Sequence, residues 1–148
     1  MSFTSLFYHI VFSTKDRQSL LSAELLPKTC KYVGGIARNL KSAVVAASGG
    51  TDHLHLAAIV HPTVPLAEFV GKVKSNSSGW IHETFPEMST FAWQDGYAAF
   101  TVSKSAMPKV LAYIGSQEEH HRRRTFKEEL LALLERHGVE YDQRYIWG

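Results

Sequence analysis

The sequence is poor in cysteine and in long apolar runs, and each shortage excludes a class of protein. Cys30 is the only cysteine among 148 residues, so an intrachain disulfide is excluded and a reducing compartment is expected. No stretch reaches the roughly 18 apolar residues that a membrane-spanning helix needs. The first residues also lack the basic and apolar segments of a signal peptide. We therefore expect a cytoplasmic protein that does not act with a membrane.

Charge of one sign is also scarce, because 16 Lys and Arg against 14 Asp and Glu leave a net charge of only +2. Overall charge therefore gives no reason to expect nucleic acid as a partner. The densest basic run, 120–124, reads His-His-Arg-Arg-Arg, and such a run is more often a solvated helix face than a phosphate site. Apolar residues at 45% and charged residues at 20% are typical of a folded chain, and the length suits one domain spanning residues 1–148.

The spacing of apolar residues predicts an alternation of strands and helices. Aromatic and β-branched residues alternate with turn-forming stretches, which indicates strands over 5–14, 42–48, 53–60 and 91–102, the last as one bent strand or two short ones. Apolar residues at helical spacing predict helices over 23–40, 66–83, 107–123 and 125–137. Ser22 is the expected N-cap of the first helix, and Gly138 is the expected end of the last.

The predicted order of elements is β-α-β-β-α-β followed by helices, which is the order of the ferredoxin-like α+β fold. In that fold two helices cover one face of an antiparallel sheet. The other face would remain exposed to water, so we expect the C-terminal helices, or those of a second subunit, to cover it.

The third predicted strand carries two histidines, His53 and His55, on either side of Leu54. Side chains alternate between the faces of a strand, so both imidazoles point the same way while Leu54 points into the core. Neutral imidazole is a good ligand for divalent metals, and two histidines leave room for a third ligand or a substrate oxygen. The motif alone is better explained by two ordinary, partly buried histidines.

The predicted helix 107–123 places Tyr113 and Gln117 four residues apart and therefore on one face. His120, His121 and Arg124 continue near that line. Taken singly, each is a common packed or surface residue. Together they offer a phenol nucleophile, a neutral oxygen ligand and cations suited to phosphate.

Five sequence blocks carry a resemblance to a known family: Tyr8–Lys15, Asp52–Leu56, Trp93–Tyr97, Tyr113–Gln117 and the pair His120-His121. In this order they resemble the successive blocks of bacterial insertion-sequence transposases of the HUH single-tyrosine superfamily, the IS200-like family that includes the repeat-associated tyrosine transposases. The resemblance runs over nearly the whole chain. It departs at Thr51, where the family often has Pro, and at Ser116, where the family often has Asn.

The resemblance implies a DNA transposase with Tyr113 as nucleophile and with His53, His55 and Gln117 as ligands of Mg²⁺ or Mn²⁺. It further implies single-stranded DNA as the partner, with hairpins at the element ends and no small-molecule substrate. The implied reaction cleaves and rejoins DNA through a 5′-phosphotyrosine bond. Members of the family act as homodimers in which one subunit can supply its catalytic helix to the histidines of the other.

Basic residues outside this set are candidates for contacts with the DNA backbone, although surface solubility explains each of them as well. They are Lys15, Arg17, Lys72, Lys74, Lys104, Arg122, Arg123 and Arg124. We also expect His9 to lie near the site.

Two other functions remain open from the residues. One is a non-catalytic, domesticated nucleic-acid-binding module on the same ferredoxin-like frame. The other is a metal hydrolase in which His53 and His55 activate water. The hydrolase would tolerate Tyr113→Phe, whereas a transposase would lose cleavage and any covalent protein–DNA species.

Overall fold

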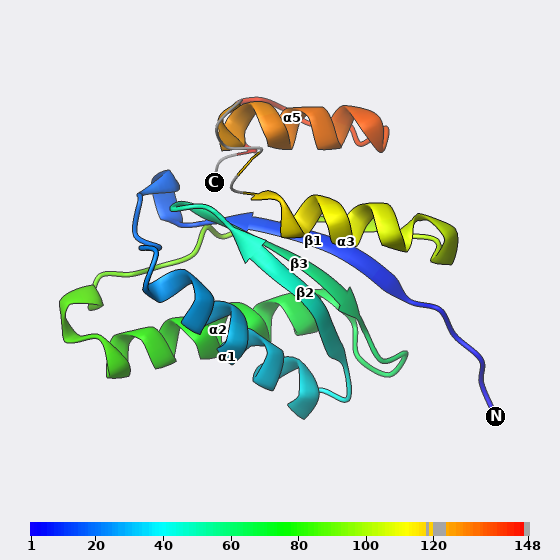
Figure 1. Ribbon diagram of the computed structural model, residues 1–148, viewed down its shortest axis with the longest axis horizontal. Coiled ribbons are helices and arrows are strands. Elements are labelled where there is room, and N and C mark those ends of the chain that lie inside the picture. The colour runs from blue at the N-terminus through cyan, green and yellow to red at the C-terminus, as the bar shows by residue number, and fades with distance from the viewer. Residues whose placement is uncertain (118, 120–123, 147–148) are drawn as a thin grey trace.

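A four-stranded antiparallel sheet forms the centre of the computed structural model, which describes residues 1–117, 119 and 124–146 (Figure 1). The strands lie in the order β2-β3-β1-β4. Their bounds are β1 Phe7–Ser13, β2 Ala43–Gly49, β3 His53–Ile59 and β4 Ala98–Thr101. Strands and helices follow one another as β1, α1, β2, β3, α2 and β4, which confirms the predicted ferredoxin-like α+β fold.

Two long helices, α1 (Leu25–Asn39) and α2 (Leu66–Thr84), pack side by side on one face of the sheet (Figure 1). Alternate residues of the central strands, such as Ile10 on β1 and Leu54 on β3, are fully buried against them. The backbone N–H of Leu25 donates to the Ser22 hydroxyl at 3.0 Å, so Ser22 caps the first turn as expected, although the helix begins two residues later than predicted.

The opposite face of the sheet is covered by α3 (Met107–Gly115) and α5 (Phe126–Arg136) (Figure 1). One apolar cluster joins Ile114 of α3 to Phe7 and Ala57 of the sheet. A second joins the apolar stripe of α5 to Val11 and Phe100. The expectation that C-terminal helices cover the open face is therefore confirmed within one chain, while the dimer stays a prediction.

Helix α5 has well-defined ends. Thr125 and Glu128 form a capping box, in which the Thr125 hydroxyl accepts from the Glu128 N–H and the Glu128 carboxylate accepts from the Thr125 N–H. Gly138 follows the helix at φ +65°, a left-handed conformation that glycine adopts without strain. The predicted start and stop of this helix are thus confirmed to within one residue.

Two predicted elements are shorter than expected. The predicted helix 107–123 is interrupted at Ser116, which leaves helical geometry at φ −110° and ψ 27°, so α3 ends at Gly115. Gln117 lies just beyond α3, and the chain is helical again at Gln117 and Glu119. Within 91–102 only β4 pairs as a strand, while Trp93 makes a single bridge with Thr14. In the described part of the chain no helix combines the length and apolarity needed to cross a bilayer.

Candidate active site

The strand histidines lie on the face of β3 that α3 and α5 cover. Both His53 and His55 are fully buried, and the intervening Leu54 points to the opposite face. The β2–β3 hairpin closes tightly before them, since a Cβ on Gly49 would collide with the carbonyl oxygen of His53. The predicted same-face placement of the two imidazoles is thereby observed.

The far nitrogen of each imidazole is held by a neighbour. His53 Nδ1 lies 2.8 Å from the Asp52 carboxylate, and His55 Nδ1 lies 2.8 Å from His9 Nε2. A carboxylate accepts hydrogen bonds, so the Nδ1–H of His53 donates to Asp52. Burial lowers the pKa of His9 to about 3, so His9 is neutral and able to accept from His55 Nδ1. This pattern fixes metal-binding histidines in many proteins.

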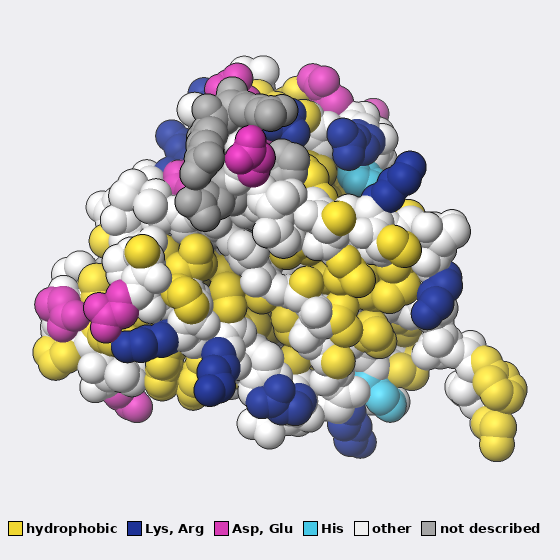
Figure 2. All heavy atoms as spheres, viewed as in Figure 1, with side chains coloured by type: hydrophobic (Ala, Val, Ile, Leu, Met, Phe, Trp, Pro, Cys, Tyr) yellow, Lys and Arg dark blue, Asp and Glu magenta, His cyan; other side chains and the backbone are white. Residues whose placement is uncertain are grey.

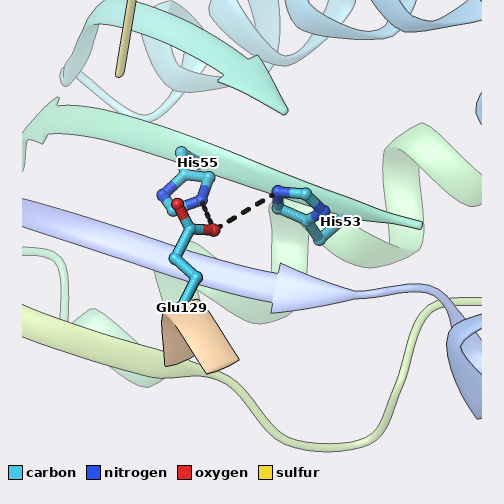
Figure 3. A group of neighbouring side chains, drawn as sticks. All are labelled: His53, His55 and Glu129. Atoms are coloured by element: carbon cyan, nitrogen blue, oxygen red, sulfur yellow. Dashed lines mark hydrogen bonds and ion pairs between the residues drawn. The ribbon is translucent and has the colours of Figure 1, made fainter. Parts of the chain in front are cut away.

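Three side chains from the C-terminal region meet these imidazoles: Tyr113 from α3, Gln117 just after it, and Glu129 from α5. Gln117 Oε1 lies 3.3 Å from His53 Nε2. Glu129 Oε1 lies 3.0 Å from His55 Nε2 and 3.6 Å from His53 Nε2 (Figure 3). The other carboxylate oxygen, Oε2, accepts from the Tyr113 hydroxyl and, at 3.2 Å, from Gln117 Nε2. All four residues predicted to form the site therefore come together within one chain.

The donor atoms suit a divalent cation. Both imidazoles and the Glu129 carboxylate offer ligand atoms within 4.8 Å of one another. Neighbouring ligands of a six-coordinate ion lie roughly 3 Å apart when the metal–ligand distance is about 2.1 Å. The observed separations of 3.0, 3.3 and 3.6 Å are close to that spacing.

Burial and hydrogen bonding set the protonation of the nucleophile candidate. Burial and the hydrogen bond to Glu129 raise the pKa of the Tyr113 hydroxyl above its usual value. Burial alone would raise the pKa of Glu129, but the hydrogen bond and charge interaction with His55 outweigh it and hold that pKa below the usual range. In the observed arrangement Tyr113 is thus a protonated donor and Glu129 an ionised acceptor.

Helix α5 closes the site from the outside. The Phe126 ring stacks on His53 with centroids 4.2 Å apart, and His53, His55, Gln117 and Glu129 have no exposed area. A cavity of about 900 Å³ lies alongside. Its lining, within the described residues, includes Asp52 and Phe126 but neither strand histidine. A phosphate can therefore approach the site from this cavity only if side chains of α5 shift.

The predicted DNA-contact residues are spread over the molecule. Lys15 and Arg17 form a short 3-10 turn after β1, and Lys104 lies exposed just before α3. Arg124 lines the cavity beside Asp52. Lys72 is exposed on α2, on the opposite face of the sheet. Figure 2 shows a row of Lys and Arg side chains over α1 and others around α5. Arg122 and Arg123, like His120 and His121, lie outside the described residues.

Lys74 supports the fold by binding a loop. Its ammonium donates to the backbone carbonyls of residues 94, 95 and 96 at 2.9, 3.2 and 2.5 Å and lies 5.4 Å from the centre of the Phe12 ring. Burial lowers its pKa to about 8. The side chain thus holds the loop before β4, and this role explains its position without DNA.

Glu129 is the site residue that the sequence did not reveal. A signal was present, because Glu129 falls within the buried stripe that Phe126, Leu130, Leu133 and Leu134 form along α5. A carboxylate at such a position calls for a polar partner. The spacing does not show which side chain the Glu129 carboxylate contacts. His9 was expected near the site, and its contact with His55 confirms that expectation.

The fold and the site first define a class: ferredoxin-like proteins in which a strand His-x-His pair faces a tyrosine from a helix. Comparison with known families then narrows the class. Residues 2–117 match the profile of the family described as "Transposase IS200 like". This match covers well over half of the chain, so the chain belongs to the IS200-like transposase family, and the predicted resemblance is confirmed.

Curated relatives agree with this assignment. The transposase for insertion sequence element IS200 of Salmonella typhimurium is 29% identical over 127 residues, covering 78% of each chain. The ISDra2 transposase TnpA of Deinococcus radiodurans is 24% identical over 117 residues, covering 76% of this chain and 84% of that one. The family relationship supports a DNA transposase.

A solved structure shares the fold. A REP-associated tyrosine transposase bound to a REP hairpin superposes with a TM-score of 0.60 at 12% identity, covering 82% of this chain and 74% of that one. At this identity the likeness shows the fold alone. A crystal structure of a Deinococcus radiodurans R1 protein assigned as a transposase gives a TM-score of 0.66 at 25% identity, with 78% and 93% coverage.

Proposed function

We propose that this transposase cleaves and rejoins single-stranded DNA, with Tyr113 as nucleophile and with a divalent ion, Mg²⁺ or Mn²⁺, held by His53, His55 and Gln117. The observation that carries the proposal is the meeting of the Tyr113 phenol and the Gln117 amide with two strand imidazoles in one buried cluster. Plain DNA binding needs none of these groups in that place. The REP hairpin bound by the structural neighbour supports hairpin-bearing DNA as the partner.

The ion would neutralise a non-bridging phosphate oxygen and so make the phosphodiester easier to attack. The Tyr113 oxygen then forms a bond to phosphorus and loses its proton to water, the bond from phosphorus to the 3′ oxygen breaks, and that oxygen takes up a proton from water. The product is a 5′-phosphotyrosine with a free 3′-hydroxyl. Because the phosphotyrosine conserves the phosphodiester bond energy, attack by another 3′-hydroxyl reverses the step and joins new DNA without ATP.

Helix α5 covers the buried site, so DNA reaches the Tyr113 hydroxyl only after α5 shifts. The Tyr113 hydroxyl donates its hydrogen bond to Glu129, and His53, His55 and Gln117 have no exposed area. In this arrangement the phenol is protonated and shielded, so it is a poor nucleophile. We therefore place DNA entry at the cavity beside Asp52 and Phe126, with a shift of α5 preceding attack.

The test looks for the covalent intermediate. The full-length protein is incubated with Mn²⁺ and a pool of labelled single-stranded oligonucleotides, with and without hairpins, and is analysed on a denaturing gel. We expect an adduct with the wild type, none with Tyr113→Phe, and an undiminished adduct with Tyr141→Phe, a matched tyrosine that bonds Glu135 away from the site.

Other outcomes would assign the rival functions. Cleavage that persists in Tyr113→Phe without an adduct would favour a metal hydrolase. DNA binding without cleavage or adduct on any member of the pool would favour the non-catalytic module.

A further inference from the structure

Glu129 on α5 lies beyond residues 2–117, the part of the chain that matches the family. We propose that Glu129 is a further ligand of the divalent ion in the DNA-free protein, so that α5 supplies part of the metal site. The proposal rests on the metal site of the proposed function. It adds a negatively charged ligand to a set of neutral ones and gives α5 a chemical role.

The first argument is geometric. Glu129 Oε1 reaches from α5 to the region that both strand histidines face (Figure 3). It lies 3.0 and 3.6 Å from the two Nε2 atoms, and Gln117 Oε1 lies 3.3 Å from His53 Nε2. Ligands at adjacent corners of an octahedral ion are roughly 3 Å apart for metal–oxygen distances near 2.1 Å. These three separations are close to those of adjacent ligands on one ion.

The second argument is charge. Imidazole and amide are neutral ligand types, and His53, His55 and Gln117 have no exposed area, so with these ligands alone the full charge of a divalent ion would be buried. Burying a charge is costly unless opposite charge lies close to it. The Glu129 carboxylate, itself fully buried, removes one unit of that charge at ligand distance. Carboxylate oxygen is also a preferred ligand type of Mg²⁺ and Mn²⁺.

The third argument is the orientation of the neighbouring groups. Glu129 Oε2 accepts from Gln117 Nε2 at 3.2 Å, and this bond turns the amide oxygen of Gln117 toward His53. The same oxygen accepts a hydrogen bond from the Tyr113 hydroxyl. One carboxylate thus links the position of the ion, through Oε1, to the nucleophile, through Oε2. An apolar residue would suit the stripe of α5 but would provide none of these contacts.

Metal binding and the docking of α5 should therefore be coupled. A ligand that binds only the docked arrangement stabilises it by mass action. Mn²⁺ should therefore hold α5 against the sheet.

The principal test measures Mn²⁺ affinity of the full-length, DNA-free protein by calorimetry. We expect Glu129→Gln, which keeps the shape and removes the charge, to weaken Mn²⁺ binding by about tenfold or more, at the level that loss of supporting groups in metal sites already reaches. Glu135→Gln, an exposed glutamate on the same helix, should bind as the wild type does. His53→Ala should abolish binding.

A second measurement gives a result with the wild type alone and is then repeated with the variant. Hydrogen exchange of the wild type should show that saturating Mn²⁺ slows exchange of the α5 amides as well as those of β3. In Glu129→Gln the protection of β3 should remain and that of α5 should be lost. Exchange of α5 that Mn²⁺ leaves unchanged would overturn the proposal even if the variant failed to fold.

The outcomes separate this proposal from the proposed function. Glu129→Gln that binds Mn²⁺ as tightly as the wild type, in a protein that still forms the Tyr113 adduct, would overturn the role of Glu129 alone. A wild type that binds no Mn²⁺ would overturn this inference and the metal site of the proposed function together.

Discussion

Both faces of the central sheet are buried by apolar clusters, but only the face under α3 and α5 also carries a cluster of polar side chains at the site. On the face under α1 and α2 the strands present Ile10, Phe12, Leu54 and Leu56. On the face under α3 and α5 the same strands present histidines that meet a phenol, an amide and a carboxylate. Neighbouring residues of β3 therefore point to opposite faces of the sheet, one into the apolar core and the next into the site.

This difference teaches how stability and reactivity can be separated in a small protein. Apolar packing requires only shape and volume, so the α1–α2 face can stabilise the fold without regard to the site. Buried polar groups need specific partners, and each partner on the other face comes from a different element. The polar face thus depends on how α3 and α5 dock, whereas the apolar face does not depend on the site.

The prediction with the largest expected effect tests whether apolar packing on one face of the sheet affects metal binding on the other. Leu54→Ala should lower the free energy of unfolding by about 3 kcal/mol, because it opens a cavity in the fully buried apolar core. Urea unfolding measures this loss. Mn²⁺ affinity of the folded protein should stay unchanged, and Leu56→Ala should behave in the same way.

The neighbouring histidine provides the contrast. His55→Ala should lose Mn²⁺ binding, although it lies next to Leu54 in the chain. A marked loss of Mn²⁺ affinity in folded Leu54→Ala would show that the faces are coupled through β3 and would contradict the separation argued above.

The apolar face and the histidine pair could be predicted from the sequence because both depend on local periodicity. Alternation along residues 53–60 is enough to place His53 and His55 together, whatever covers them. The pairing of Tyr113 with Gln117 was expected from a continuous helix. It is observed although Ser116 interrupts that helix, because Gln117 is helical again and both side chains reach the same buried cluster.

Long-range docking explains what the sequence could not provide. Glu129 reaches the histidines only because α5 crosses the sheet, and the spacing within α5 shows a buried carboxylate without showing its partner. The shortness of β4 has a similar origin. Lys74 and Gln94 hold the loop at 94–96 by contacts with α2 and β1, which pattern alone does not reveal.

A smaller effect concerns acid stability of the polar face. His9 has a pKa of about 3 in the folded protein, chiefly because of burial, against 6.5 for an exposed histidine. Between these values only the unfolded chain binds the proton, so acidification favours unfolding and stability rises with pH across this window. One such group contributes a slope of at most about 1.4 kcal/mol per pH unit.

Urea unfolding in EDTA at pH 7 and pH 5 measures this dependence. We expect His9→Asn to lose less stability between these pH values than the wild type, because the substituted residue does not titrate. His61→Asn, which replaces a histidine outside the site, serves as the control and should keep the wild-type dependence. Equal pH dependence in all three proteins would show that His9 does not contribute to it.

The smallest expected effect compares the first turns of α1 and α5, one on each face. Thr125→Ala removes the capping box of α5 and Ser22→Ala removes the hydroxyl that caps α1, each costing about 1 kcal/mol of stability. Only Thr125→Ala frays the turn that carries Glu129, so only this variant should weaken Mn²⁺ binding, by at most about fivefold since 1.4 kcal/mol corresponds to tenfold. Calorimetry measures the Mn²⁺ affinity of both variants. Equal weakening in the two would mean that Mn²⁺ affinity depends on overall stability and not on the packing of α5 against the sheet.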